Sequence, residues 1–237
     1  MYNKIIHYGC SFTYGVDSGG DGIDDPTKSY PAYLSKKTNI PFLNRANPGA
    51  SLNQIALKIH EDLQNPASEI QDKNILVIVN LTDVFRMISS TCDWWPSTVN
   101  GHKLSVCNIN ATTQFKISSG MDAALNSLIN EQEWVFYYYA YNIINSIHYQ
   151  LVTANKKFVF VDMLTDITAL EQYFKLSVDI KNKILTNDVN TFKNFSSFVR
   201  FNQLSPTYYS HDGHYSSKGY KLLADLVLCK LQEMSVL

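Results

Sequence analysis

The sequence predicts an α/β fold, a three-layer α/β/α sandwich around a mostly parallel central sheet. Short apolar segments typical of strands alternate along the chain with longer segments of helical periodicity. Two of the apolar segments, residues 74–80 and 157–163, lack the polar alternation of a half-exposed strand, which indicates strands buried on both faces of a parallel sheet. The 237 residues, 45% of them hydrophobic and 17% charged, suffice for one domain with a substantial core.

Four strands are expected. Residues 4–8 (KIIHY) form a short apolar strand that ends at Gly9, and residues 40–46 (IPFLNRA) form the second strand. The continuous apolar run 74–80 (NILVIVN) is expected in the centre of the sheet, and residues 157–163 (KFVFVDM) form the fourth strand. Because an active site in such a sheet lies at the carboxyl ends of the strands, the residues that follow each strand are the candidates for function.

Four longer segments have the periodicity of helices, at residues 29–37, 52–63, 131–154 and 217–234. In the first of them Pro31 falls in the opening turn, where proline is tolerated. Ser51 stands at the N-cap position of the second, and the third is rich in aromatic residues. Apolar stripes mark the second and the last helix, formed by Leu52, Ile55, Ala56, Ile59 and Leu63 in one and by Tyr220, Leu223, Ala224, Val227, Leu228 and Leu231 in the other.

Two stretches, residues 84–130 and 179–206, lack a clean period. Long irregular insertions in a compact domain are often lids or substrate walls. We therefore expect a single domain of residues 1–237 with a cap-like insertion at about 84–130. No internal repeat, low-complexity tract or linker divides the chain.

Composition and charge exclude several classes of function. The net charge is −1 and no basic stripe is visible, which argues against a nucleic-acid groove. Neither a signal peptide nor an apolar run of about 18 residues is present, so we expect a cytoplasmic protein without a membrane segment. The four cysteines form no C-x-x-C pair and fit free thiols, although a Cys92–Cys107 bridge fits an exported protein. The oligomeric state does not follow from the sequence.

Three side chains could make up a nucleophilic site. Ser11 directly follows the first strand in the segment 9–13 (GCSFT), where a serine at a strand-to-helix turn can act as a nucleophile. A serine there is also a common helix N-cap, and the segment lacks the G-x-S-x-G spacing of a nucleophile elbow. Asp212 and His214, in the segment 210–215 (SHDGHY), precede the last helix, where a histidine can face the serine and a carboxylate can fix its tautomer.

Two further loops follow strands. In residues 47–51 (NPGAS), Gly49 permits a tight turn with a free backbone N–H. Residues 80–83 (NLTD) offer polar side chains that could donate to an oxyanion. Each segment also fits an ordinary loop or a helix cap. The order is more specific than any one piece: serine after strand one, glycine after strand two, polar residues after strand three, and Asp with His before the last helix.

This order of motifs resembles the SGNH (GDSL-like) hydrolase family. The matching blocks lie between residue 7 and about residue 228, at residues 9–15 (GCSFTYG), 47–51, 80–83 and 212–220. The resemblance implies the SGNH/flavodoxin-like version of the α/β/α sandwich. It also implies a Ser–His–Asp hydrolase that acts on esters, often O-acetyl or other acyl groups of sugars or small molecules, with no metal or organic cofactor. By matching positions, it implies Ser11 as nucleophile and oxyanion donor, Gly49 as second donor, His214 as base and Asp212 as its orienting partner.

The sequence departs from the family pattern in two blocks. The third block is usually G-x-N-D, whose asparagine is an oxyanion donor, but here Thr82 occupies that position. Either the Thr82 hydroxyl donates, or Asn80 turns in, or the donor is missing; Arg86 could take over part of the role or be an exposed surface residue. Loss of one donor costs roughly 3–4 kcal/mol of transition-state stabilisation.

The fifth block is usually D-x-x-H, whereas the residue three before His214 is His211. The D-x-H spacing of Asp212 occurs in SGNH-like sugar acetyltransferase relatives, which favours Asp212 as the orienting residue. His211 is then a candidate substrate contact or a support of the site. A dyad of Ser11 and His214, with a backbone carbonyl as orienter, is the alternative.

Other functions fit parts of the pattern. His211, Asp212 and His214 could be metal ligands, but no further ligand clusters with them, so no metal is expected. A carbohydrate-binding module with an eroded site and a sugar O-acyltransferase are the rival readings; a pure binder has no need of both Ser11 and His214.

Aromatic residues make up 13% of the chain, including fifteen Tyr. Most are expected to fill the core. Five fall in the irregular insertion or beside the Asp212 loop, and we expect them to form a substrate wall around Ser11 for a small-molecule or carbohydrate ester: Trp94, Trp95, Tyr208, Tyr209 and Tyr215.

Overall fold

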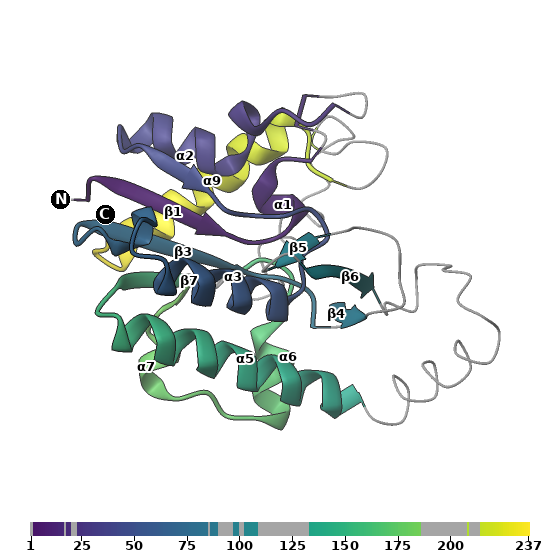
Figure 1. Ribbon diagram of the computed structural model, residues 1–237. Helices are drawn as coiled ribbons and strands as arrows, with labels where there is room; N and C mark the ends of the chain where they lie inside the picture. Colours follow the sequence, from purple (N-terminus) through teal and green to yellow (C-terminus); the bar gives the residue numbers. More distant parts are fainter. Residues whose placement is uncertain are drawn as a thin grey trace.

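A five-stranded parallel sheet forms the centre of the protein (Figure 1). The computed structural model describes residues 2–16, 18–19, 23–84, 86–89, 97–99, 102–108, 133–185, 208 and 214–237. The strand order is β2-β1-β3-β7-β8, and every neighbouring pair is parallel. The strands are β1 (Lys4–Tyr8), β2 (Phe42–Asn44), β3 (Ile75–Leu81), β7 (Lys157–Asp162) and β8 (Ile184–Leu185). The α/β fold with a parallel sheet is thus confirmed.

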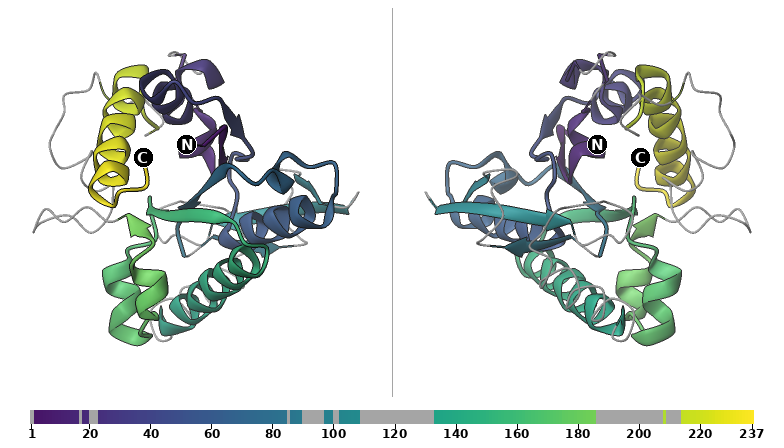
Figure 2. Two further views of the ribbon diagram at one scale, coloured as in Figure 1. Left: turned by 90° about the vertical axis from the view of Figure 1, so that its left-hand side faces the viewer. Right: turned by 90° about the vertical axis from the view of Figure 1, so that its right-hand side faces the viewer.

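Helices cover both faces of the sheet, which makes three layers (Figure 2). One face carries α2 (Tyr30–Thr38) and α9 (Ser217–Glu233), which pack against each other, with the short α1 (Ser11–Tyr14) at the end of β1. The other face carries α3 (Leu52–Gln64) and α5 (Glu133–Thr153), with α6 (Ile167–Tyr173) beside α5. The chain further contains α7 (Val178–Lys181) and the 3₁₀ turns η1 (Pro26–Lys28) and η2 (Glu69–Gln71).

The core lies on both faces of the two central strands. All seven residues of β3 are buried, as are five of the six residues of β7. This explains why both segments read as continuous apolar runs, since neither strand has a face in water. The described part of the chain contains no helix that is both long and apolar enough to span a lipid bilayer.

The expected elements are present, with shifted ends. The second strand covers only Phe42–Asn44, at the sheet edge, where all three residues are half-buried. The helix expected at 29–37 begins one residue later because Ser29 is its N-cap. It ends at Thr38, and its C-cap Asn39 has the left-handed conformation (φ 55°).

The stretch 179–206 was expected to be irregular, and for its first residues this expectation is wrong. The end of α7 and the whole of β8 lie there, and β8 is the fifth strand of the sheet. α6, between β7 and α7, was not expected either. With two residues in β8, four in α7 and seven in α6, these elements are too short to show a periodic pattern.

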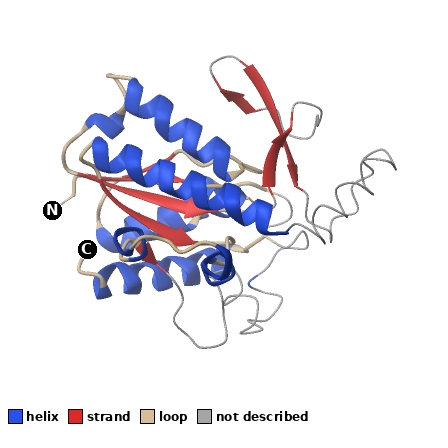
Figure 3. Ribbon diagram, turned by 90° about the horizontal axis from the view of Figure 1, so that it is seen from below, coloured by secondary structure: helices blue, strands red, loops and turns tan. Residues whose placement is uncertain are grey.

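The described part of the insertion contains strands. β4 (Arg86–Ser89), β6 (His102–Asn108) and β5 (Ser97–Val99) form a second, antiparallel sheet in that order (Figure 3). Val84 is also described, whereas the rest of residues 84–130, including Trp94 and Trp95, lies outside the described residues.

The start of α3 is closed by a capping box. Ser51 Oγ accepts from the Gln54 N–H (3.4 Å), and Gln54 Oε1 accepts from the Ser51 N–H (3.0 Å). We expect Ser51→Ala to lower the free energy of unfolding by about 1 kcal/mol in urea titrations, because it leaves a buried helix N–H without an acceptor. Ser68→Ala is the matched control: Ser68 is also buried at an N-cap, but within the described chain its hydroxyl has no partner. Equal losses in the two variants would contradict the assignment.

Candidate active site

Three of the proposed motif loops meet at the carboxyl edge of the sheet. The loop after β1 and the loop after β2 are joined by the hydrogen bond from the Asn47 N–H to the Gly9 carbonyl (3.1 Å). The end of β3 is tied to the loop after β7, because the Leu164 N–H donates to the Leu81 carbonyl (3.1 Å). The parallel pairing of β1 with β2 and β3 thus brings these loops together at one edge.

Ser11 is the first residue of α1, directly after the Cys10 N-cap, and its side chain is buried. The turn that leads to it needs glycine at position 9, since a Cβ there would lie 2.1 Å from Thr13 Oγ1. α1 ends at Gly15, whose φ of 99° suits glycine. Ser11 therefore sits on a short, tightly closed strand-to-helix turn.

Asn44, at the end of β2, holds this turn from the side. Its Nδ2 donates to the Thr13 carbonyl (3.0 Å), and its Oδ1 accepts from the Ala46 N–H (3.1 Å). Sequence reasoning did not single out Asn44; the only signal was a polar residue at the end of a predicted strand.

His214 lies beside the Ser11 turn. Its ring centroid is 5.0 Å from that of Phe12, the residue after Ser11. From the first turn of α9, the Tyr220 hydroxyl donates to the Val16 carbonyl (3.0 Å). The described residues show no hydrogen bond between the Ser11 hydroxyl and the His214 ring. Such catalytic hydrogen bonds often tighten only when substrate is bound.

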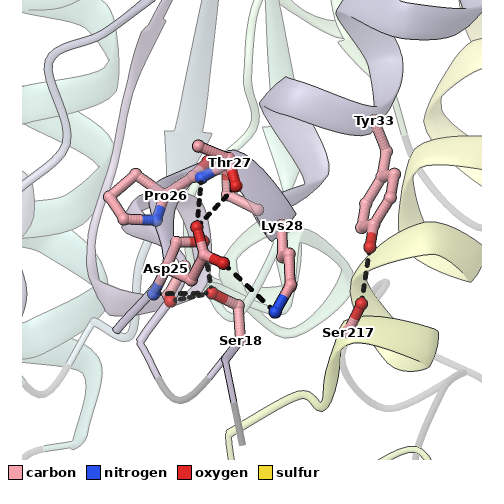
Figure 4. A network of polar contacts seen from close by, with 9 residues as sticks. Ser18, Asp25, Pro26, Thr27, Lys28, Tyr33 and Ser217 are labelled. Atoms are coloured by element: carbon pink, nitrogen blue, oxygen red, sulfur yellow. Dashed lines mark hydrogen bonds and ion pairs between the residues drawn. The ribbon is translucent and has the colours of Figure 1, made fainter. Parts of the chain in front are cut away.

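Hydrogen bonds of Tyr33, on α2, and of Ser18, in the loop after α1, fix segments next to the candidate site (Figure 4). The hydroxyls of Tyr33 on α2 and Ser217 at the start of α9 are 2.5 Å apart, which fixes the segment that follows His214. In the loop after α1, Ser18 Oγ donates to the Gly15 carbonyl (2.6 Å) and accepts from the Asp25 N–H (3.1 Å). The first contact ties the start of α9 to α2, and the second ties the loop after α1 to the start of η1.

Tyr215 does not line a substrate wall, and that expectation is wrong. Its side chain is fully buried, with its ring 5.1 Å from that of Phe12 and 5.4 Å from that of Tyr220. Tyr208 is half-buried, and its carbonyl accepts from the Ser216 N–H (2.9 Å). Arg86 lies in β4, but its side chain is not described. The remaining candidates lie outside the described residues: Trp94, Trp95, Tyr209, His211 and Asp212.

Two further oxyanion candidates are the backbone N–H of Gly49 and the side-chain hydroxyl of Thr82. Gly49 has a φ of 74° in the turn after β2, and within the described residues its N–H has no acceptor. Thr82 directly follows β3 and is fully buried. Its carbonyl accepts from Thr165 Oγ1 (2.6 Å), whereas its own hydroxyl has no partner in the described chain.

Asn80 belongs to a buried polar network. Its Nδ2 donates to the Tyr8 carbonyl (2.9 Å), and its Oδ1 accepts from the Tyr30 hydroxyl. The Tyr30 oxygen lies 3.2 Å from His7 Nδ1, so Nδ1 carries the proton that Tyr30 accepts. Burial lowers the pKa of His7 to about 3, which keeps this ring neutral. These bonds oppose the expectation that Asn80 turns into an oxyanion site, since turning would leave buried groups unpaired.

Asp162 ends β7 at the same edge, opposite Leu81 of β3. It is fully buried, and its Oδ2 accepts from the Ile167 N–H (3.1 Å). Burial raises the pKa of its carboxyl to about 7. Sequence reasoning marked this position only as the end of a strand.

Comparisons with known proteins show the fold. No family model matches the sequence, and no curated protein matches it. Solved structures match over nearly the whole chain. A G-D-S-L family protein from Desulfitobacterium hafniense is 14% identical with a TM-score of 0.54, and the match covers 97% of this chain and 99% of that one. A lipolytic G-D-S-L family member from Veillonella parvula is 13% identical (TM-score 0.53; 95% and 96% covered). The psychrotrophic esterase EstA from Pseudoalteromonas is 10% identical (TM-score 0.53; 98% and 97% covered).

Proposed function

We propose that this chain, whose fold is that of the SGNH-like hydrolases, is a serine esterase that cleaves an acyl ester of a small molecule or carbohydrate. The observation that carries the proposal is the position of His214, against the turn that begins with Ser11. Ser11 and His214, about 200 positions apart in the sequence, are of the types that form a nucleophile and its base. They belong to segments that pack against each other, through Phe12 and His214, at the edge where an active site is expected in such a sheet.

In the proposed mechanism His214 takes the proton of the Ser11 hydroxyl as Oγ attacks the ester carbonyl. The tetrahedral intermediate then collapses, and His214 gives that proton to the leaving alcohol oxygen. A water molecule then attacks the acyl-serine while the same histidine takes its proton. As the second tetrahedral intermediate collapses, His214 returns this proton to Ser11 Oγ and the acid is released. Asp212 is proposed to hold His214 in the required tautomer.

The negative oxygen of the intermediate needs donors already aimed at it. We assign this role to the backbone N–H groups of Ser11 and Gly49 and to the hydroxyl of Thr82. The support for Thr82 is its buried hydroxyl, which has no acceptor in the described chain and can donate without breaking a bond. Thr82 thereby stands in for the asparagine of the family pattern.

Covalent labelling tests the proposal. A fluorophosphonate probe reacts with an activated serine, so we expect one adduct on the peptide that contains Ser11, and no adduct in Ser11→Ala. Ser68→Ala, which removes another buried serine hydroxyl, is expected to label like the wild type. Absence of labelling in the folded wild type, or unchanged labelling of Ser11→Ala, would reject Ser11 as the nucleophile.

A further inference from the structure

A groove lies between α3 and α5. These two helices cover the face of the sheet opposite α2 and α9 (Figures 1 and 2). The groove has a volume of about 540 Å³, within the range of small-molecule sites. Its polar lining consists of Asn53 and His60 from α3 and of Tyr139, Asn142, Ser146 and Gln150 from α5; alanine, leucine and isoleucine side chains of the two helices complete it.

The lining combines apolar surface with uncharged polar groups. Among the described residues, no Asp, Glu, Lys or Arg borders the groove, so an ionic ligand would be held there without a counter-charge. Three of the polar residues are amides, which both donate and accept hydrogen bonds, as sugar hydroxyls do. This inventory matches a neutral polyhydroxylated ligand.

The hydrogen bonds along α5 leave this capacity in place. Asn142 Nδ2 donates to the Tyr138 carbonyl (2.7 Å), which leaves its second N–H and its oxygen for a ligand. Gln150 Nε2 donates to Ser146 Oγ (3.2 Å), so the hydroxyl proton of Ser146 points elsewhere. Both bonds fix the side chains on the helix surface and reduce the entropy that a ligand must remove.

Tyr139 adds an aromatic face. Its side chain is 49% exposed, so much of its ring area is open to a partner. The C–H face of a pyranose ring is the apolar part of a neutral sugar, and an exposed tyrosine ring provides flat apolar surface for it together with a polar hydroxyl. An apolar peptide would leave the surrounding amides unpaired.

The residues that line the groove extend along α3 from its first turn. Asn53 lies in the first turn of α3, four residues after Gly49, and His60 lies seven residues further along the same helix. Seven residues are about two turns, or about 10 Å of helix. A chain-like ligand in the groove therefore extends away from the loop that carries Gly49.

We propose that this groove binds a neutral oligosaccharide, with Tyr139 against a sugar ring and the amides of Asn53 and Asn142 on its hydroxyls. The inference concerns binding alone and does not depend on the chemistry proposed for Ser11.

Isothermal titration with unacylated cellohexaose, xylohexaose and chitohexaose tests it, with hexagalacturonate as the charged comparison. None of these oligomers carries an ester, and the N-acetyl groups of chitohexaose are amides, so binding is measured apart from ester hydrolysis. We expect at least one neutral oligomer to bind, and Tyr139→Ala to weaken that binding at least tenfold. Tyr149→Ala is the matched control, because Tyr149 is on the same helix, is 71% exposed and does not border the groove.

Three outcomes would overturn the inference: no neutral oligomer binds, hexagalacturonate binds more tightly than all of them, or Tyr139→Ala and Tyr149→Ala weaken binding equally. Asn142→Ala, which keeps the ring, is expected to weaken binding several-fold and guards against an effect of Tyr139 on folding. Fluorophosphonate labelling of Tyr139→Ala is expected to match the wild type, so failure of the groove and failure of the esterase proposal are distinguishable.

Discussion

We expect His214→Ala to lower kcat for a short p-nitrophenyl ester by about 10⁴- to 10⁶-fold, and Ser11→Ala to do the same. The reason is that each residue depends on the other: without its base the Ser11 hydroxyl keeps its proton at neutral pH, and without the hydroxyl the histidine has no nucleophile to activate. Phe12 packs the His214 ring against the Ser11 turn, in agreement with a shared role of the two residues.

The double variant distinguishes a catalytic pair from two independent losses. If Ser11 and His214 act as one unit, the double variant loses no more activity than either single variant. His148→Ala, in α5 away from this edge, is expected to keep wild-type kcat. Additive losses in the double variant, or a His214→Ala enzyme within tenfold of the wild type, would refute the pair.

Asp162→Asn is expected to stabilise the protein by about 4 kcal/mol at alkaline pH and hardly at all near pH 4. Burial raises the pKa of the folded Asp162 carboxyl from 3.8 to about 7. A raised folded-state pKa gives stability that is fully present below the unfolded value, and that stability is lost as the pH rises through about 7. The amide cannot ionise, so the variant keeps its stability above that pH, and its oxygen can still accept from the Ile167 N–H.

Urea unfolding of both proteins across the range from about pH 4 to about pH 9 provides the measurement. The difference in the free energy of unfolding should grow between the two pKa values and become constant above the higher one. Asp72→Asn, at an exposed carboxylate, is the control and should show a small difference at every pH. A gain from Asp162→Asn that does not vary with pH would show that something other than ionisation is responsible.

The central strands and the long helices could be predicted from the sequence because burial or periodicity is visible over many residues. β3 has seven consecutive buried residues, and α3 repeats its apolar stripe over three turns. β8 could not be predicted, because two residues are too few to show a pattern and because its pairing with β7 depends on the tertiary structure. The same holds for α6 and α7.

For the candidate site, the sequence predicted where the motif loops lie at the sheet edge better than it predicted which side chains surround them. The loops of Ser11 and Gly49 were predicted from strand ends, and the hydrogen bond between their loops agrees with that placement. Tyr215 was misjudged because its neighbours in the sequence are polar, whereas its neighbours in space are Phe12 and Tyr220. Asn44 and the His7–Tyr30–Asn80 network depend on contacts across 23 to 50 residues, for which a single sequence offers no signal. The roles of Asp212, Trp94 and Trp95 stay predictions.

Two buried residues, His7 in β1 and Asp162 in β7, have opposite effects on the pH dependence of the stability of this protein. Unfolding lets His7 take up a proton below about pH 6.5, while it makes Asp162 release one above about pH 4. Between these values the uptake and the release cancel, so these two residues together leave stability independent of acidity there. Asp162→Asn removes the proton release and leaves the proton uptake by His7. The free energy of unfolding of this variant, which gains most stability at alkaline pH, therefore falls on acidification through the range in which the two residues of the parent protein compensate each other.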